Sequence, residues 1–108
     1  MRGNVDNVGY LGFTKQVEVH ASRAIDATVY HNTSGRPMLV SISCVCNFGD
    51  VINAYSDANA TPTTIVVSMG HSNIQPVGMS LTFLVLPGNY YKINQTGTST
   101  LSYWVEYT

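Results

Sequence analysis

The sequence predicts an all-β protein, namely an antiparallel, jelly-roll-like β-sandwich of seven or eight strands. Three observations predict this fold. Short segments alternate between apolar and polar residues, with the period of two that a half-buried strand requires. Clusters of Gly, Pro, Asn, Asp and Ser separate these segments at short intervals. No window of eleven or more residues sustains a helical period, so helices are not expected to build the core.

Residues 1–13 are predicted to form an N-terminal arm or loop, because they hold three glycines and show little periodicity. Residues 14–108 are predicted to form a single β-sandwich domain, since a chain of 108 residues supports one hydrophobic core. The first two strands are expected over 16–20 and 26–31. In the first of them, Val17 and Val19 alternate with polar residues.

The clearest strand is predicted over residues 38–48. Its even-numbered positions are all apolar: Met38, Val40, Ile42, Cys44, Cys46 and Phe48. Because side chains two apart share a face, the two cysteines are expected as buried free thiols on the core side. Their Cα atoms would lie about 6.5–7 Å apart, at the outer limit for a disulfide. Residues 47–50 then predict a tight hairpin.

Five further strands are predicted over residues 51–55, 64–69, 79–86, 90–93 and 101–107. The third of these is apolar on both faces at residues 83–86, which predicts a central strand covered on both sides. In the last strand, the apolar face is assigned to Leu101, Tyr103, Val105 and Tyr107. Ser102, Trp104 and Glu106 are assigned to the opposite face.

Charged residues make up only 10% of the chain, against roughly 25% in typical soluble domains. Ser, Thr and Asn together number 30, so uncharged polar groups must cover most of the surface. The net charge of −1 and the scattered basic residues argue against nucleic-acid binding, which needs clustered Lys and Arg. No apolar run approaches the roughly 20 residues that span a bilayer, so membrane insertion is not expected.

No catalytic constellation stands out in the sequence. The six acidic residues are dispersed, and the three histidines have no metal-ligand spacing. The Gly-His-Ser run at residues 70–72 lacks the second glycine of a nucleophile elbow. We therefore expect a protein that is not an enzyme and that needs no metal or cofactor.

Aromatic residues and polar loops are the candidate binding elements. Tyr90–Tyr91 and Tyr103–Trp104 are adjacent pairs, so one ring of each must point away from the core, to pack at an interface or to offer a platform for a sugar or partner. The longest polar connections span 56–63 and 70–76, and their candidate binding residues are Tyr55, Asp57, Asn59, His71 and Asn73. Chain order puts the two loops at opposite ends of the sandwich. We favour residues 55–59 as the site; solvated turns without a ligand are the alternative.

Two segments resemble phage tail-fibre and receptor-binding proteins of virions. Residues 28–41 read TVYHNTSGRPMLVS and are similar to a strand–turn–strand that opens a small β-sandwich in those proteins. Residues 83–92 read FLVLPGNYYK and are similar to a later turn, with Leu86 where the family has a proline. The chain then closes on an aromatic–acidic strand, WVE at residues 104–106. The similarity covers about residues 26–107.

This resemblance implies a non-catalytic fibre or spike module for host-surface attachment, which forms a homotrimer and is located in the virion. Reduced thiols fit assembly in the host cytoplasm. The partners would be other copies of the chain and a glycan or protein of the host surface. Two alternatives remain open: a trimerisation or decoration module without receptor contact, and a lectin-like carbohydrate-binding module.

Overall fold

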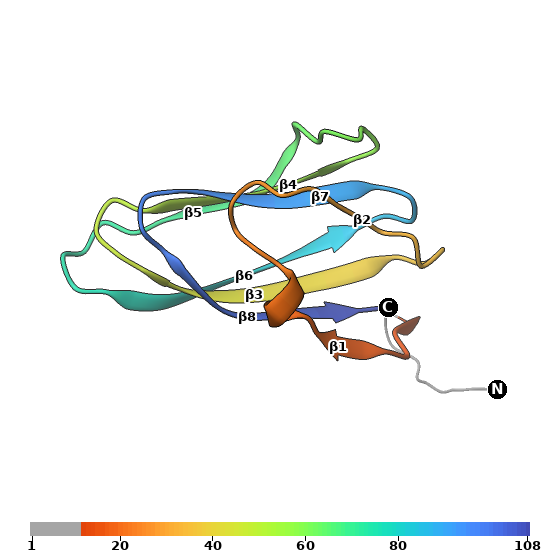
Figure 1. The fold of residues 1–108 in the computed structure, drawn as a ribbon, viewed down its shortest axis with the longest axis horizontal. Coiled ribbons are helices and arrows are strands. Elements are labelled where there is room, and N and C mark those ends of the chain that lie inside the picture. The colour runs from red at the N-terminus through yellow and green to blue at the C-terminus, as the bar shows by residue number, and fades with distance from the viewer. Residues whose placement is uncertain (1–11) are drawn as a thin grey trace.

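The computed structural model describes residues 12–108, which form two four-stranded antiparallel sheets packed face to face (Figure 1). The predicted β-sandwich is therefore confirmed. The strands are β1 (Gln16–Glu18), β2 (Tyr30–His31), β3 (Met38–Cys46), β4 (Val51–Asp57), β5 (Ile65–Gly70), β6 (Val77–Val85), β7 (Tyr90–Thr96) and β8 (Thr100–Tyr107). One 3-10 turn, η2 (His20–Ser22), follows β1. In this part of the chain no helix is long and apolar enough to cross a membrane.

The strand pairing is that of a ribbon rolled into a jelly roll. Strand β1 pairs with β8, β2 with β7, β3 with β6 and β4 with β5, always antiparallel. Rolling this ribbon gives the sheet orders β1-β8-β3-β6 and β2-β7-β4-β5. Among the described strands, β4 and β5 are the one pair joined by a hairpin, and the other connections cross between sheets. The turn at residues 47–50 is therefore present but is not the predicted hairpin, because it carries the chain from β3 to β4 in the other sheet.

The core lies between the sheets and follows the predicted alternation along β3 up to Cys46; Phe48, the last apolar position of the predicted strand, lies beyond β3 and is 64% exposed. The five even-numbered side chains of β3, from Met38 to Cys46, are all buried. In the core they lie beside Leu81, Phe83 and Val85 of the same sheet. The other sheet contributes Ile52, Ala54, Tyr91 and Ile93 to the same core. Cys44 and Cys46 are free thiols, each 1% exposed, as predicted.

The predicted second strand is much shorter than residues 26–31. Regular pairing with β7 is limited to Tyr30 and His31. Asp26 forms an isolated bridge with Asn94, and Ala27 then adopts a positive φ of 71°. A non-glycine residue in that region of backbone space interrupts an extended strand.

Two predicted faces are wrong, and the first is in β6. This strand is an edge strand, paired with β3 on one side only, and so is not central. Leu81, Phe83 and Val85 are buried, but Leu84 is 49% exposed, and Leu86 just beyond the strand is 53% exposed. A run that is apolar on both faces therefore leaves apolar side chains at the surface of this chain.

The second wrong face is in β8, where the register shifts. Ser43 lies opposite Tyr103 and Cys44 opposite Leu101, so Ser102 is an extra residue in the strand. Such a bulge reverses the alternation beyond it. Leu101 still packs against the core, but Trp104 and Glu106 then turn inward and Tyr103 turns outward, where it is 63% exposed.

The thiols allow a direct check of the β3 faces. Burial, together with the neighbouring Cys46 thiol, raises the pKa of Cys44 to about 11, so little reactive thiolate forms near neutral pH. We expect both cysteines to react with a thiol reagent only as fast as the protein unfolds. Replacing either by Ser should cost about 1–3 kcal/mol, because a hydroxyl is buried without an assured partner. Rapid labelling of the native protein would show that β3 is inverted.

Candidate functional site

The buried carboxylate of Glu106 is the centre of the polar interior. Its Oε2 accepts hydrogen bonds from Arg23 Nε at 3.0 Å, Tyr91 Oη at 2.6 Å and Trp104 Nε1 at 3.0 Å. Its Oε1 accepts from Arg23 Nη2 at 3.0 Å. Burial of an isolated carboxylate is very costly, and these four donors offset that cost.

This network joins segments that are far apart in the chain. Glu106 and Trp104 belong to β8, Tyr91 belongs to β7 of the other sheet, and Arg23 follows η2. Burial raises the pKa of Tyr91, and its hydrogen bond to Glu106 raises it further, so the phenol stays a donor. Burial alone lowers the pKa of Arg23, but its hydrogen bond to Glu106 and the charge of that residue raise it overall. The four donor groups of the carboxylate thus come from one charged residue, Arg23, and two neutral ones, Tyr91 and Trp104.

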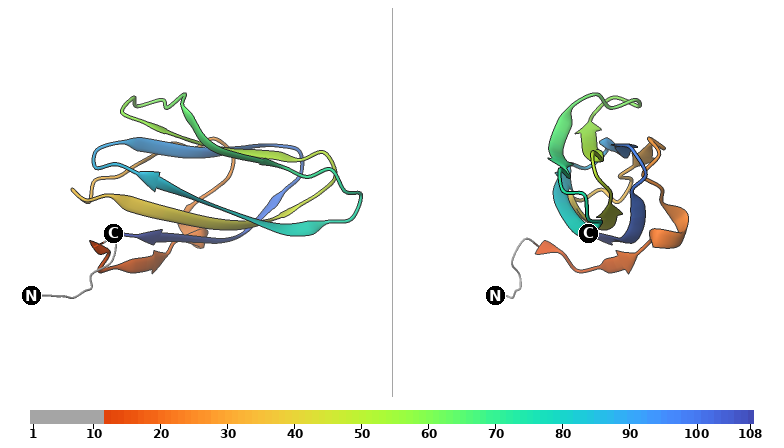
Figure 2. Two further views of the ribbon diagram at one scale, coloured as in Figure 1. Left: turned by 180° about the vertical axis from the view of Figure 1, so that it is seen from behind. Right: turned by 90° about the vertical axis from the view of Figure 1, so that its left-hand side faces the viewer.

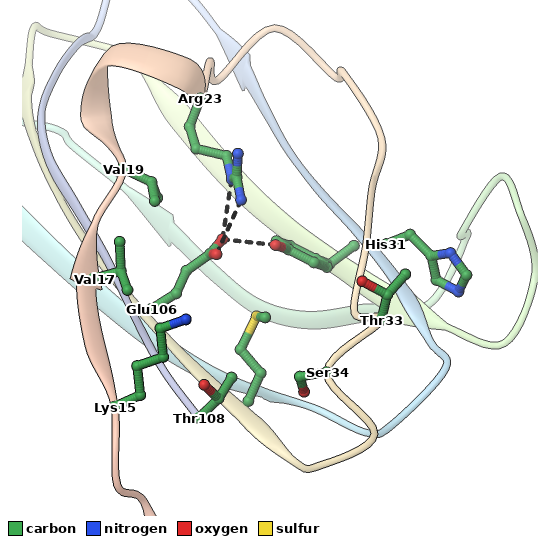
Figure 3. A pocket seen from close by; sticks show the side chains of 11 residues that line it. Lys15, Val17, Val19, Arg23, His31, Thr33, Ser34, Glu106 and Thr108 are labelled. Atoms are coloured by element: carbon green, nitrogen blue, oxygen red, sulfur yellow. Dashed lines mark hydrogen bonds and ion pairs between the residues drawn. The ribbon is translucent and has the colours of Figure 1, made fainter.

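A pocket opens over this network, between β1 and the segment that follows β2 (Figure 3). Its volume is about 260 Å³. The lining residues are Lys15, Val17, Val19, Arg23, His31, Thr33, Ser34, Met38, Tyr91, Glu106 and Thr108. Apolar side chains of β1 and Met38 thus share the walls with hydroxyl and cationic groups, as in sites for small polar ligands.

The polar groups of the pocket differ in their availability. Glu106 is occupied by its four donors, and Arg23 is directed to Glu106 and Ser22. Lys15 has no hydrogen-bond or ion-pair partner for its amine within residues 12–108, and Figure 3 shows its side chain reaching into the pocket. Lys15 is therefore the cation that a ligand can meet, while Arg23 and Glu106 support the wall.

Asn32 fixes the rim of the pocket and is fully buried. Its Nδ2 donates to the carbonyl oxygens of Arg36 at 2.8 Å, Val85 at 3.2 Å and Leu86 at 3.3 Å. Its Oδ1 accepts from the backbone and hydroxyl of Ser34. Asn32 thereby ties residues 28–41 to residues 83–92, the two segments that carry the resemblance, into one structural unit.

A row of aromatic rings continues from the pocket rim over the outer face of the β2-β7-β4-β5 sheet. His31, which also lines the pocket, stacks on Tyr90 with ring centroids 4.0 Å apart and an interplanar angle of 8°. Lys92 Nζ lies 4.8 Å from the centre of the Tyr55 ring. Asp57 is the strand partner of Tyr90 and Tyr55 that of Lys92, so these residues share one end of the face. Tyr91 and Trp104 are the buried members of the two adjacent aromatic pairs.

The structure places the predicted site residues in two separate groups. Tyr55 and Asp57 lie at the end of β4, and Asn59 follows in the next loop. Tyr90 lies opposite Asp57 on the neighbouring strand β7. Asp57 orders its own loop by accepting from the backbone N–H groups of Thr63, Asn59 and Thr64, which lower its pKa to about 2. The carboxylate is therefore engaged within the loop.

His71 and Asn73 lie at the opposite end, as chain order requires. His71 is buried and its Nε2 lies 2.6 Å from the carbonyl oxygen of Gln75. Asn73 Oδ1 accepts from the backbone N–H of Gln75. Both residues thus close the loop between β5 and β6 on itself.

Lys15, Arg23, Thr33 and Glu106 were missed by the sequence reasoning. The available signal was the spacing of Trp104 and Glu106, which are two apart and must share a face. A tryptophan side chain is highly buried on average. Had Trp104 been placed in the core, Glu106 would have followed it there and required a buried cation.

Substitution of Asn32 tests whether its hydrogen bonds stabilise the rim of the pocket. Asn32→Asp keeps the shape but removes both donor hydrogens and directs a charge at three carbonyl oxygens. We expect a loss of at least about 3 kcal/mol in the free energy of unfolding at neutral pH. Asn59→Asp, on an exposed loop residue, is the matched control and should stay within about 0.5 kcal/mol. Urea denaturation measures both, and equal effects would contradict the role given to Asn32.

Comparisons with protein families, with curated proteins and with solved structures find no match for this chain. Its function is therefore inferred from its geometry and from the resemblance of residues 26–107.

Proposed function

We propose that this chain is a non-catalytic attachment module of a virion fibre or spike. We further propose that it binds a carbohydrate of the host surface in the pocket between β1 and the segment that follows β2. The observation that carries this proposal is the pocket itself, which combines an apolar wall, an amine and threonine hydroxyl groups without partners among residues 12–108, and a rigid polar network below them. The attachment role also draws on the resemblance to tail-fibre proteins.

The size of the pocket favours a single sugar unit. Its volume of about 260 Å³ is just below the roughly 300–1,000 Å³ of sites for drug-sized ligands. Thr33 and Thr108 offer hydroxyl groups for hydrogen bonds with sugar hydroxyls, and the aliphatic walls suit the apolar face of a ring. Lys15 adds a point charge, so we expect a preference for sugars that carry a carboxylate or another acidic group.

The fold is compatible with this function. Jelly rolls occur in viral capsid proteins and in lectin domains. The rigid ion pair in the pocket wall is a more specific argument for ligand binding than the fold. Arg23 and Glu106 hold the pocket wall by a two-pronged ion pair, so little ordering is required when a ligand binds.

A glycan array followed by titration calorimetry tests the proposal. The wild-type chain should retain acidic glycans and bind them more weakly as salt increases. Lys15→Gln should weaken binding about 10- to 100-fold, because a charge-assisted hydrogen bond is lost. Thr33→Val should weaken it about 5- to 10-fold through the loss of a neutral hydrogen bond.

Lys92→Gln is the matched control, since it removes the same charge beside Tyr55 on the outer sheet face. Its affinity should equal that of the wild type. Loss of binding in Lys92→Gln or Tyr55→Ala, with Lys15→Gln unaffected, would move the site to the 55–59 region that the sequence favours. Absence of any retained glycan would contradict carbohydrate binding.

A further inference from the structure

The two edge strands opposite the pocket contain no charged residue. Residues 58–91 contain no Asp, Glu, Lys or Arg, and they include the whole of β5 and β6. These two strands are the edge strands of their sheets on one side of the molecule. The right-hand view of Figure 2 shows them together on that side, with η2 on the other.

Exposed apolar side chains gather on the same segment. Ten large hydrophobic side chains are exposed in the described part of the chain, and six of them lie between residues 65 and 86. These six are Ile65, Val66, Ile74, Val77, Leu84 and Leu86. We call the surface formed by β5, β6 and these side chains the β5–β6 side. These side chains are spread along the two strands, with Ile74 and Val77 at one end of β6 and Leu84 and Leu86 at the other. Exposed apolar side chains along one edge of a domain favour association with another chain.

The backbone of β6 is also unprotected. It pairs with β3 over nine residues without a register shift, and its other edge has no strand partner within residues 12–108. Edge strands are usually blunted by Lys, Pro, a bulge or short length. Strand β5 carries a bulge near Val66, but β6 has none of these devices. A long, uncharged edge without a bulge is able to pair with another chain.

We infer that copies of this chain associate through the β5–β6 side. The charge pattern identifies the partner. A surface that meets itself about a symmetry axis brings like charges together, and this side has no such charges to repel. A charged partner surface would lose hydration without gaining an ion pair.

This inference goes beyond the proposed function, and the two are compatible in space. The pocket lies between the β1 and β2 edges, and the β5–β6 side lies at the other edge of both sheets. Association through β6 therefore leaves the pocket facing outward in every copy. A neighbouring copy on this side would cover Leu84 and Leu86, which are exposed in the single chain.

Light scattering coupled to gel filtration is the test. The wild-type chain at micromolar concentration should elute with the mass of two or three chains. Leu84→Lys puts a charge on an exposed position of β6, where copies would repel each other, so we expect a single chain and a dissociation constant raised at least about 100-fold. Leu86→Lys should act in the same way and serves if Leu84→Lys fails to fold.

Thr96→Lys is the control, because Thr96 is exposed on β7 of the other sheet. It should keep the wild-type mass. A wild-type monomer at about 100 μM would overturn the inference, as would an oligomer that survives both Lys variants. Glycan affinity per chain should not change in Leu84→Lys, so failure of this inference and failure of the proposed ligand site are distinguishable.

Discussion

The Glu106 carboxylate is the constraint on which the two sides of the sandwich depend. A β8 without a bulge would direct this residue to solvent, but the extra residue Ser102 turns it inward together with Trp104. Once inside, the carboxylate must be matched by donors, and Tyr91, Trp104 and Arg23 provide them. Loss of one donor would leave a buried charge partly uncompensated. The packing of β8 on β7, the position of residues 23–31 and the wall of the pocket therefore all depend on one group.

The two edge strands β5 and β6 contain no charged residue, whereas a charged cluster lies at the edge formed by β1 and β8. Lys15, Glu18 and Arg23 lie in or next to β1 and η2, and the buried Glu106 of the neighbouring β8 pairs with Arg23. The β5–β6 side has no formal charge over 34 consecutive residues, counted from 58 to 91 in the sequence. A polar pocket on one side and an apolar edge on the other suit a module that joins its own copies by one surface and a ligand by another.

The sequence alone predicted the strands whose environment is simple. Strand β3 has buried neighbours on one side throughout, so its alternation from Met38 to Cys46 was read correctly. The order of the strands could not be derived, since a short connection such as residues 47–50 serves equally for a hairpin or for a crossing between sheets. The prediction assigned the two faces of β8 the wrong way round, because the inserted Ser102 reverses the alternation of inward and outward side chains. No local sequence signal marks Ser102 as a bulge.

The candidate site was harder to predict than the fold. Its residues come from four segments, around Lys15, Arg23, Thr33 and Glu106, that only the rolled topology brings together. Loop polarity pointed instead to residues 55–59 and 71–73, where the polar atoms of Asp57 and His71 satisfy their own loops. The same types of polar residue order turns and bind ligands, so only the contacts in the structure distinguish the two roles.

A double-mutant cycle between Tyr91 and Glu106 tests the central role of the carboxylate most directly. Urea unfolding of Tyr91→Phe, Glu106→Leu and the double variant can be followed by the fluorescence of Trp104, the single tryptophan of the chain. If the hydrogen bond to Glu106 stabilises the joint between the sheets, Tyr91→Phe costs about 1.5–3 kcal/mol in the wild type and almost nothing in the Glu106→Leu background. An equal cost in both backgrounds would show that packing alone joins the sheets, and would contradict the account.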